Sequence, residues 1–186
     1  APPVETADVV RVLVVDDHPL VRKGITAALT QERHILVVAE AGTSQEAIAA
    51  YTEHRPDVVL LDLSLPDIDG VATARKLRAL HADVRIVIFT SFLSEEDVAQ
   101  AIAAGVRAYA LKDMKPDELH RCVLAVAAGQ TCFSSAVATA LATRIEDDSL
   151  SERERDVLAY LGRGLSNKAI GRLAGITEGT VKTHVK

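Results

Sequence analysis

Five times in the first two-thirds of the chain, a short apolar run rich in β-branched residues is followed by a stretch with helical spacing. This alternation is typical of a parallel sheet with helices packed on both faces. We therefore predict an α/β fold with a five-stranded, doubly wound parallel sheet. The predicted strands are VRVLVV, ILVVAEAG, DVVLLD, RIVIFT and AYALK.

Carboxylates follow two of the predicted strands. Asp16 and Asp17 come directly after the first strand, and Asp62 closes the third. The carboxyl ends of parallel strands meet at one edge of a sheet, where ligands bind, so we expect these groups to converge. Taken singly, each could be a solvated loop or capping residue. Together they would repel one another unless a cation neutralised them, and Mg²⁺ prefers such hard oxygen ligands.

A hydroxyl and an ammonium group end the next two strands. Thr90 closes the fourth strand and Lys112 the fifth. Each is an ordinary strand-end residue when considered alone. As a set with Asp62 they favour phosphoryl chemistry, because Lys112 would neutralise phosphoryl oxygens and Thr90 would donate a hydrogen bond to them.

Other polar residues near these strand ends are interpreted as structural. Asp67 and Asp69 lie in the loop LPDIDG, where Asp69 is expected to cap the following helix. His18 is interpreted as a cap-region or solvated side chain. Cys122 and Cys132 show no metal-binding spacing and no disulfide framework, so we expect two reduced thiols.

Charge divides the chain into an acidic body and a basic end. The net charge is −5, but residues 1–128 carry −6 and residues 149–186 carry +3. A basic module on an acidic protein suggests binding to a polyanion.

The basic end carries the signals of three short helices. Ser151, Ser166 and Thr177 each precede a helical pattern as an N-cap would. Gly175 lies in the turn between the last two patterns, as in a helix-turn-helix.

Motifs in both parts resemble known modules. VVDDHP, VVLLDLSLPDIDG, IVIFTS and AYALKD resemble, in order and spacing, the receiver domains of two-component response regulators. The segment LSERERDVLAYLGRGLSNKAIGRLAGITEGTVKTHVK is similar to the LuxR-type helix-turn-helix of the NarL/FixJ-like subfamily. The resemblance implies a flavodoxin-like receiver domain over 8–128, a linker with a helix over 129–149, and a small all-α DNA-binding domain over 150–186.

The resemblance also implies roles for the strand-end residues. Asp62 would accept a phosphoryl group from the phosphohistidine of a sensor histidine kinase, assisted by Lys112 and Thr90. Thr90 would then move toward the phosphoryl group, and Tyr109 would turn inward as the aromatic switch residue. The implied Mg²⁺ ligands are Asp16, Asp17, Asp62 and the backbone carbonyl of Ser64.

In the DNA-binding domain, the resemblance implies contacts from the second helix of the helix-turn-helix with promoter DNA. Lys182, Thr183 and Lys186 are expected at base edges, and Thr177 and Thr180 at phosphates. The sequence stops at Lys186, within the predicted recognition helix, so we expect a truncated domain with poor DNA binding.

The predicted function is a phosphorylation-dependent, DNA-binding transcription regulator that dimerises on phosphorylation. It would not be an enzyme, beyond assisting its own phosphorylation and dephosphorylation. The chain has no apolar run long enough to span a membrane, and the N-terminal APPVETADVV lacks the features of a signal peptide, so we expect a cytoplasmic protein without a membrane partner. Two alternatives stay open: a phosphorylation-independent regulator with a degenerate receiver, and a Mg²⁺-dependent phosphatase. Such a phosphatase usually needs a second Asp where this chain has Ser64.

Overall fold

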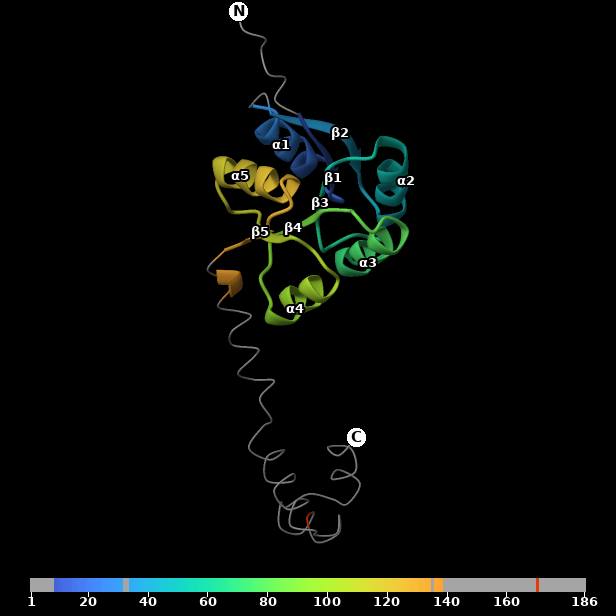
Figure 1. The fold of residues 1–186 in the computed structure, drawn as a ribbon, viewed down its shortest axis with the longest axis vertical. Helices are drawn as coiled ribbons and strands as arrows, with labels where there is room; N and C mark the ends of the chain where they lie inside the picture. The colour runs from blue at the N-terminus through green and yellow to red at the C-terminus, as the bar shows by residue number, and fades with distance from the viewer. Residues whose placement is uncertain (1–8, 32–33, 135, 139–169, 171–186) are drawn as a thin grey trace, which may run out of the picture. The chain divides into compact units, whose positions relative to one another are not determined.

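A computed structural model describes residues 9–31, 34–134, 136–138 and 170. The chain divides into two compact units, Ala1–Leu141 and Ala142–Lys186. Every helix and strand named below belongs to the first unit (Figure 1). None of the helices in the described ranges is both long enough and apolar enough to cross a membrane.

Six parallel strands form one sheet in the order β2-β1-β3-β4-β5-β6. The predicted doubly wound parallel sheet is confirmed, but the predicted count of five strands is wrong. The additional strand has only two residues, too few to show a period in the sequence. The strands are β1 (Val10–Val15), β2 (Ile35–Ala41), β3 (Val58–Leu61), β4 (Ile86–Thr90), β5 (Ala108–Leu111) and β6 (Cys132–Phe133).

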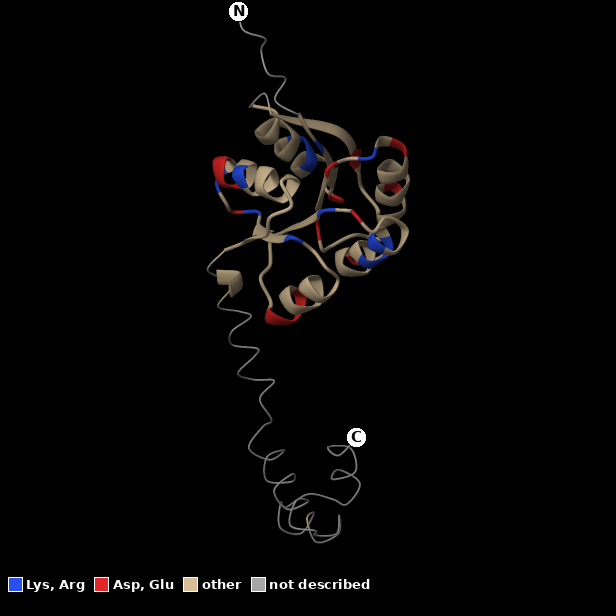
Figure 2. Ribbon diagram, in the orientation of Figure 1, with Lys and Arg blue, Asp and Glu red and all other residues tan. Residues whose placement is uncertain are grey.

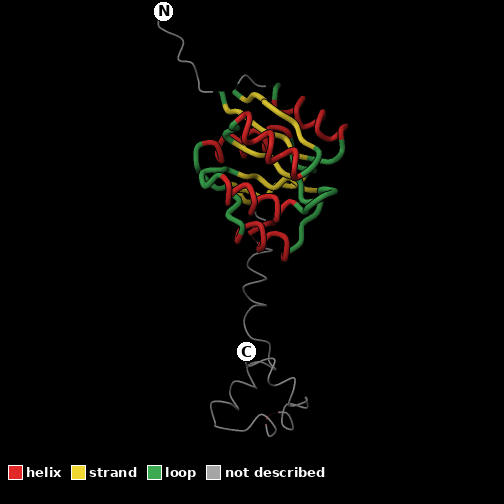
Figure 3. The backbone as a smooth tube through the Cα atoms, turned by 90° about the vertical axis from the view of Figure 1, so that its right-hand side faces the viewer, coloured by secondary structure: helices red, strands yellow, loops and turns green. Residues whose placement is uncertain are grey.

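In the described part of the chain, five helices cover the two faces of the sheet, as Figures 1 and 3 show. Helices α1 and α5 pack on one face, and α2, α3 and α4 pack on the other. All four residues of β3 are buried, because this strand lies inside the sheet and is covered on both faces. The helices are α1 (Pro19–Leu29), α2 (Ser44–His54), α3 (Gly70–Leu80), α4 (Glu95–Ala103) and α5 (Pro116–Ala127).

Polar side chains fix the starts of three of these helices. Thr43, Asp69 and Ser94 accept hydrogen bonds from backbone N–H groups in the first turns of α2, α3 and α4. The predicted cap at Asp69 is confirmed, with its Oδ1 atom 2.9 Å from the nitrogen of Ala72. These caps fix the ends of the loops that follow β2, β3 and β4.

Candidate functional site

The loop after β1 buries one carboxylate and leaves its neighbour partly open. Asp16 is 1% exposed, and its N–H group donates to the carbonyl of Ala41 at 3.0 Å. The Oδ1 atom of Asp16 accepts from the backbone N–H of His18 at 2.8 Å. The side chain of Asp17 is 31% exposed, and its Oδ1 atom lies 2.5 Å from the Nδ1 atom of His18. The loop therefore presents two carboxylates side by side.

Asp62 is the buried carboxylate that follows β3. It is 4% exposed, its N–H group donates to the carbonyl of Val15 at 2.9 Å, and its Oδ1 atom accepts from the N–H of Leu63 at 2.8 Å. Gly70, the first residue of α3, lies tightly against this turn. A Cβ atom at Gly70 would lie 2.2 Å from the carbonyl oxygen of Asp62, so the turn requires glycine there.

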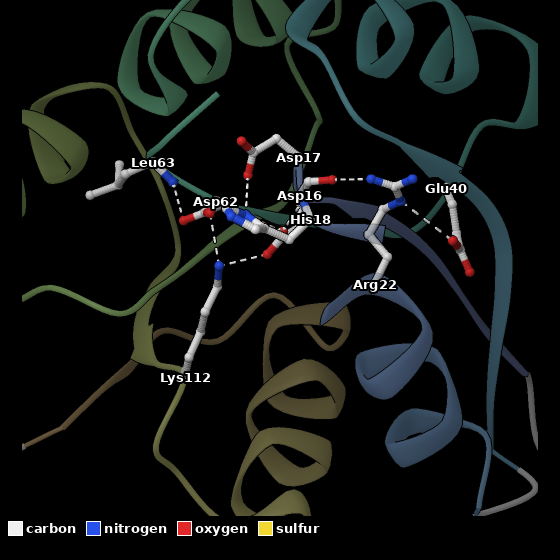
Figure 4. Close-up of polar contacts among 8 residues, drawn as sticks. All are labelled: Asp16, Asp17, His18, Arg22, Glu40, Asp62, Leu63 and Lys112. Atoms are coloured by element: carbon white, nitrogen blue, oxygen red, sulfur yellow. Dashed lines mark hydrogen bonds and ion pairs between the residues drawn. The ribbon is translucent and has the colours of Figure 1, made fainter. Parts of the chain in front are cut away.

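Lys112 links the two buried carboxylates (Figure 4). Its Nζ atom lies 2.8 Å from Oδ2 of Asp62, in a hydrogen bond, and 2.6 Å from Oδ2 of Asp16, in an ion pair. Burial alone would lower the pKa of Lys112, but its interactions with Asp16 and Asp62 outweigh burial and raise that pKa above its ordinary value. The ammonium group is thus held in its charged form between the acids.

The oxygen atoms at this edge fit a hard cation. Oδ2 of Asp16 and Oδ1 of Asp17 are buried atoms that make no hydrogen bond, although each has a cationic or imidazole group nearby. Within the described part of the chain, Asp16, Asp17 and His18 each offer a ligand atom within 4.8 Å of the others. Mg²⁺ prefers the carboxylates over the imidazole. Asp62 does not belong to that group, and the Lys112 ammonium lies between its Oδ2 atom and Oδ2 of Asp16.

A pocket of about 210 Å³ opens at the same edge. Ser64, whose backbone carbonyl is a predicted metal ligand, lies in its wall together with Asp62 and Lys112. The complete lining is His18, Val21, Asp62, Ser64, Thr90, Ser91, Phe92 and Lys112. The predicted residues at the ends of three different strands therefore face one space.

Thr90 and Tyr109 lie beside that pocket and are both 1% exposed. Oγ1 of Thr90 accepts from the N–H of Phe92 at 3.4 Å, which is a weak hydrogen bond. The hydroxyl of Tyr109 donates to the carbonyl of Phe92 at 3.0 Å, so its ring already lies inward in this structure. Burial, with the charges of Asp97 and Asp62, raises the pKa of Tyr109 to about 12. Asp97 belongs to the acidic first turn of α4 (Figure 2).

Two residues near the site have roles that the sequence did not predict. Asp67, interpreted as a loop residue, accepts hydrogen bonds from the N–H groups of Ser44 and Gln45 and so supports the start of α2. Those bonds lower the pKa of Asp67. Arg22 of α1 donates to the carbonyl of Asp16 at 2.5 Å. Neither role has a local sequence signal, because each partner comes from another element of the fold.

The predicted DNA-contacting residues, Thr177, Thr180, Lys182, Thr183 and Lys186, lie outside the described residues. The two cysteines are free thiols on α5 and β6. Burial, and to a smaller extent a hydrogen bond to Cys132, raises the pKa of Cys122.

Comparison with protein families finds two adjoining domains. Residues 12–124 match the response regulator receiver domain. Residues 148–186 match the luxR family of bacterial regulatory proteins. The two matches together span most of the chain.

Curated relatives match along nearly the whole sequence. The nitrate/nitrite response regulator protein NarL of Escherichia coli is 39% identical over 184 residues, covering 94% of this chain and 85% of that protein. The DNA-binding transcriptional activator DevR/DosR of Mycobacterium tuberculosis is 38% identical over 184 residues, covering 95% of this chain and 85% of that protein.

Solved structures show the same architecture. A LuxR-family two-component response regulator from Aurantimonas is 34% identical with a TM-score of 0.70, over 74% of this chain and 98% of that one. The response regulator ChrA of a heme-sensing two-component system is 35% identical with a TM-score of 0.62, over 95% of this chain and 87% of that one.

Proposed function

The chain belongs to the two-component response regulators that join a receiver domain to a LuxR-type DNA-binding domain, and we propose that Asp62 is the residue on which it is phosphorylated. Its family is one of DNA-binding transcription regulators that are controlled by phosphorylation. A receiver domain indicates a histidine kinase as partner, and a LuxR-type domain indicates binding to DNA. The proposal adds which residues of this chain carry the phosphoryl chemistry.

The observation that carries the proposal is the pairing of Asp62 with Lys112. Oδ1 of Asp62 is oriented by the N–H of Leu63, and Oδ2 is held 2.8 Å from the Lys112 ammonium. A carboxylate held in this way is fixed in direction, as a nucleophile must be. The pocket beside it gives a phosphoryl donor access to the carboxylate.

In the proposed reaction, a carboxylate oxygen of Asp62 attacks the phosphorus atom of the kinase phosphohistidine. The new O–P bond forms as the P–N bond breaks, and the imidazole leaves with its electron pair. Lys112 binds a phosphoryl oxygen as negative charge gathers there, and the Thr90 hydroxyl donates to another. Catalysis of this kind consists of positioning and electrostatic stabilisation.

Asp16, Asp17, Asp62 and the carbonyl of Ser64 are the proposed ligands of Mg²⁺. When bound, the ion offsets the negative charge of the carboxylates and of the phosphoryl group. The buried oxygen atoms of Asp16 and Asp17 that make no hydrogen bond support this assignment. Hydrolysis of the acyl phosphate, in which water attacks phosphorus, the P–O bond to the Asp62 carboxylate breaks and inorganic phosphate leaves, would be the chain's own dephosphorylation. We propose no other enzymatic activity.

Phosphorylation would change output through Thr90 and Tyr109. A phosphoryl group on Asp62 would draw the Thr90 hydroxyl toward it and remove the weak contact with Phe92. The hydroxyl of Tyr109 is bonded to the same residue, so that loop connects the two side chains. We propose that this rearrangement promotes homodimerisation in the cytoplasm and DNA binding by residues 150–186 at promoter sites.

The domain boundaries follow from the same assignment. We propose residues 8–128 as the receiver domain, with residues 129–149 as the connection to the DNA-binding domain. Strand β6 lies in that connection and pairs with β5, so the sheet itself extends past Ala128.

The test is intact-mass measurement after incubation with Mg²⁺ and a small acyl-phosphate donor. We expect one phosphoryl adduct on the parent chain, none after addition of a chelator, and none on Asp62→Asn. Asp67→Asn is the matched control, because Asp67 is an acid five residues further on that binds α2 instead. An adduct that persists on Asp62→Asn, or its absence from the parent chain, would contradict the proposal.

A further inference from the structure

The peptide that follows Asp16 is held by an arginine from the next helix. The carbonyl oxygen of Asp16 lies at the end of β1, and Arg22 donates to it from its Nη1 atom at 2.5 Å. Arg22 lies in the second turn of α1, since its N–H group donates to the carbonyl of His18. Its side chain therefore reaches back over the loop that carries Asp16 and Asp17 (Figure 4).

The guanidinium group is itself held in place from the neighbouring strand. Its Nε atom lies 3.5 Å from Oε2 of Glu40, at ion-pair distance. Oε1 of Glu40 accepts a hydrogen bond from the hydroxyl of Thr26 at 2.8 Å. Gly42 leaves room for the group, because a Cβ atom there would lie 3.3 Å from Nη1 of Arg22. The arginine thus donates a hydrogen bond from Nη1 to Asp16, and its buried Nε atom, which makes no hydrogen bond, faces the Glu40 carboxylate at ion-pair distance.

A β-bulge in β2 directs Glu40 toward this arginine. The register pairs Val12 with Val37 but Leu13 with Ala39, so Val38 has no partner in β1. Residues before the bulge pack with α1, whereas Ala39 and Ala41 pack on the opposite face. Glu40 pairs with Val14 and so points to the α1 side. Bulges that redirect a side chain in this way are frequent beside functional sites.

We propose that Arg22 is a positioning residue for the Mg²⁺ site, held by Glu40 and acting through the peptide that joins Asp16 to Asp17. The inference rests on the proposed function, because it takes these two carboxylates as metal ligands. Arg22 and Lys112 both lie beside the acids, but they contact different atoms. Lys112 contacts carboxylate oxygens that the metal needs, whereas Arg22 binds a backbone carbonyl and leaves those oxygens free.

Groups that orient metal ligands without touching the metal commonly change metal affinity 10- to 100-fold when removed. We therefore expect Arg22→Gln to weaken Mg²⁺ binding by about 10-fold, because the Asp16–Asp17 peptide loses its donor. The measurement is calorimetric titration of the unphosphorylated full chain with Mg²⁺. Lys23→Gln is the matched control, since it removes one positive charge from an exposed neighbour on α1 and should leave the affinity unchanged.

Conservative variants separate positioning from a general loss of structure. Arg22→Lys keeps the charge and one donor and should recover part of the affinity. Glu40→Gln removes the negative charge that faces Arg22 but keeps a side chain of the same size. We expect it to weaken Mg²⁺ binding by about 3-fold, less than Arg22→Gln, because Glu40 acts only through Arg22. The phosphorylation rate of Arg22→Gln should return to the parent rate at saturating Mg²⁺. Urea unfolding in chelator measures the stability of each variant separately.

Parent-like Mg²⁺ affinity in Arg22→Gln would overturn the inference, and so would a loss that Lys23→Gln shares. A rate that stays low at saturating Mg²⁺ would also overturn it, because it would mean that Arg22 acts on the chemistry itself. Failure of the proposed function is distinguishable: the parent chain would then bind Mg²⁺ in an Arg22-dependent manner without gaining a phosphoryl group on Asp62.

Discussion

The site has two halves that are held differently: the carboxylates that follow β1 and β3, together with Lys112, form the first, and Thr90 of β4 with Tyr109 of β5 forms the second. In the first half, the carboxylates of Asp16 and Asp62 are fixed by backbone N–H groups and by Lys112 at 2.6 to 2.8 Å. In the second half, Thr90 has one weak contact at 3.4 Å, and Tyr109 has one hydrogen bond to a carbonyl of Phe92, whose side chain is 71% exposed.

This difference corresponds to the two tasks of the switch that we propose. Chemistry at Asp62 needs groups that are already in position, because reorganising them would add to the barrier. A response needs groups whose contacts are weak enough to exchange. Phosphorylation can shift the equilibrium between two conformations only by the difference in its interaction free energy with each of them. We therefore call the first half the acceptor half (Asp16, Asp17, Asp62 and Lys112) and the second the response half (Thr90 and Tyr109).

The largest effect is expected from Lys112→Met in the acceptor half. The variant leaves two buried carboxylates without their cation, and breaking a buried pair in this way costs about 3–5 kcal/mol. The loss should appear in urea unfolding with chelator and should shrink when Mg²⁺ is added. Lys115→Met is the control, because Lys115 is exposed at the start of α5. An unchanged unfolding free energy would show that the acceptor half is not held by charge.

Gly70→Ala tests whether the acceptor half depends on close backbone packing. The added methyl group would lie 2.2 Å from the carbonyl oxygen of Asp62, so the turn must move, and overpacking of this kind costs about 1–3 kcal/mol. We also expect slower phosphorylation, because Asp62 moves with its carbonyl. Gly24→Ala is the control: a Cβ atom at Gly24, in α1, meets nothing within 4 Å, and the change should stabilise the chain by about 0.5–1 kcal/mol. Equal stability of both variants would contradict the expectation.

The acceptor half could be predicted from the sequence far better than its supports. Asp16, Asp62 and Lys112 follow strands, and parallel strands deliver their carboxyl ends to one edge whatever their loops contain. Arg22 and Glu40 could not be predicted, because their contact depends on a bulge at Val38 that leaves no mark in a continuous apolar run. The sheet was predicted except for β6, whose pairing is decided by its neighbour β5 and not by its own two residues.

In the response half, Thr90→Ala and Thr90→Ser separate the hydroxyl from the methyl group. Each variant removes part of a buried side chain, at about 1 kcal/mol per methyl-sized group. Both should still be phosphorylated on Asp62, since the acceptor half is intact, but Thr90→Ala should react more slowly because it lacks the hydroxyl that donates to a phosphoryl oxygen. Only Thr90→Ser should preserve the change in the ring signals of Tyr109 on phosphorylation, measured by NMR. A normal change in Thr90→Ala would remove Thr90 from the response half.

Tyr109→Phe should have the smallest effect near neutral pH, about 1 kcal/mol, because it removes one hydrogen bond, from the Tyr109 hydroxyl to the carbonyl of Phe92. The effect should change with pH. Burial raises the pKa of Tyr109 to about 12, so the folded chain retains this proton at a pH where the unfolded chain, with a pKa near 10, has lost it. That contribution is fully present below pH 10 and is lost as the pH rises toward 12.

The parent chain should therefore lose stability between pH 10 and 12, and Tyr109→Phe should lose less over the same range. Lys112, whose pKa is also raised, adds to the loss in both proteins and cancels in the comparison. Urea unfolding at pH 8, 10 and 11 measures the difference in stability between the two proteins. Tyr51→Phe is the matched control, because burial also raises the pKa of Tyr51, which lies on α2. If the parent and Tyr109→Phe fell in parallel, the Tyr109 hydroxyl would be open to solvent, and the response half would be looser than this structure shows.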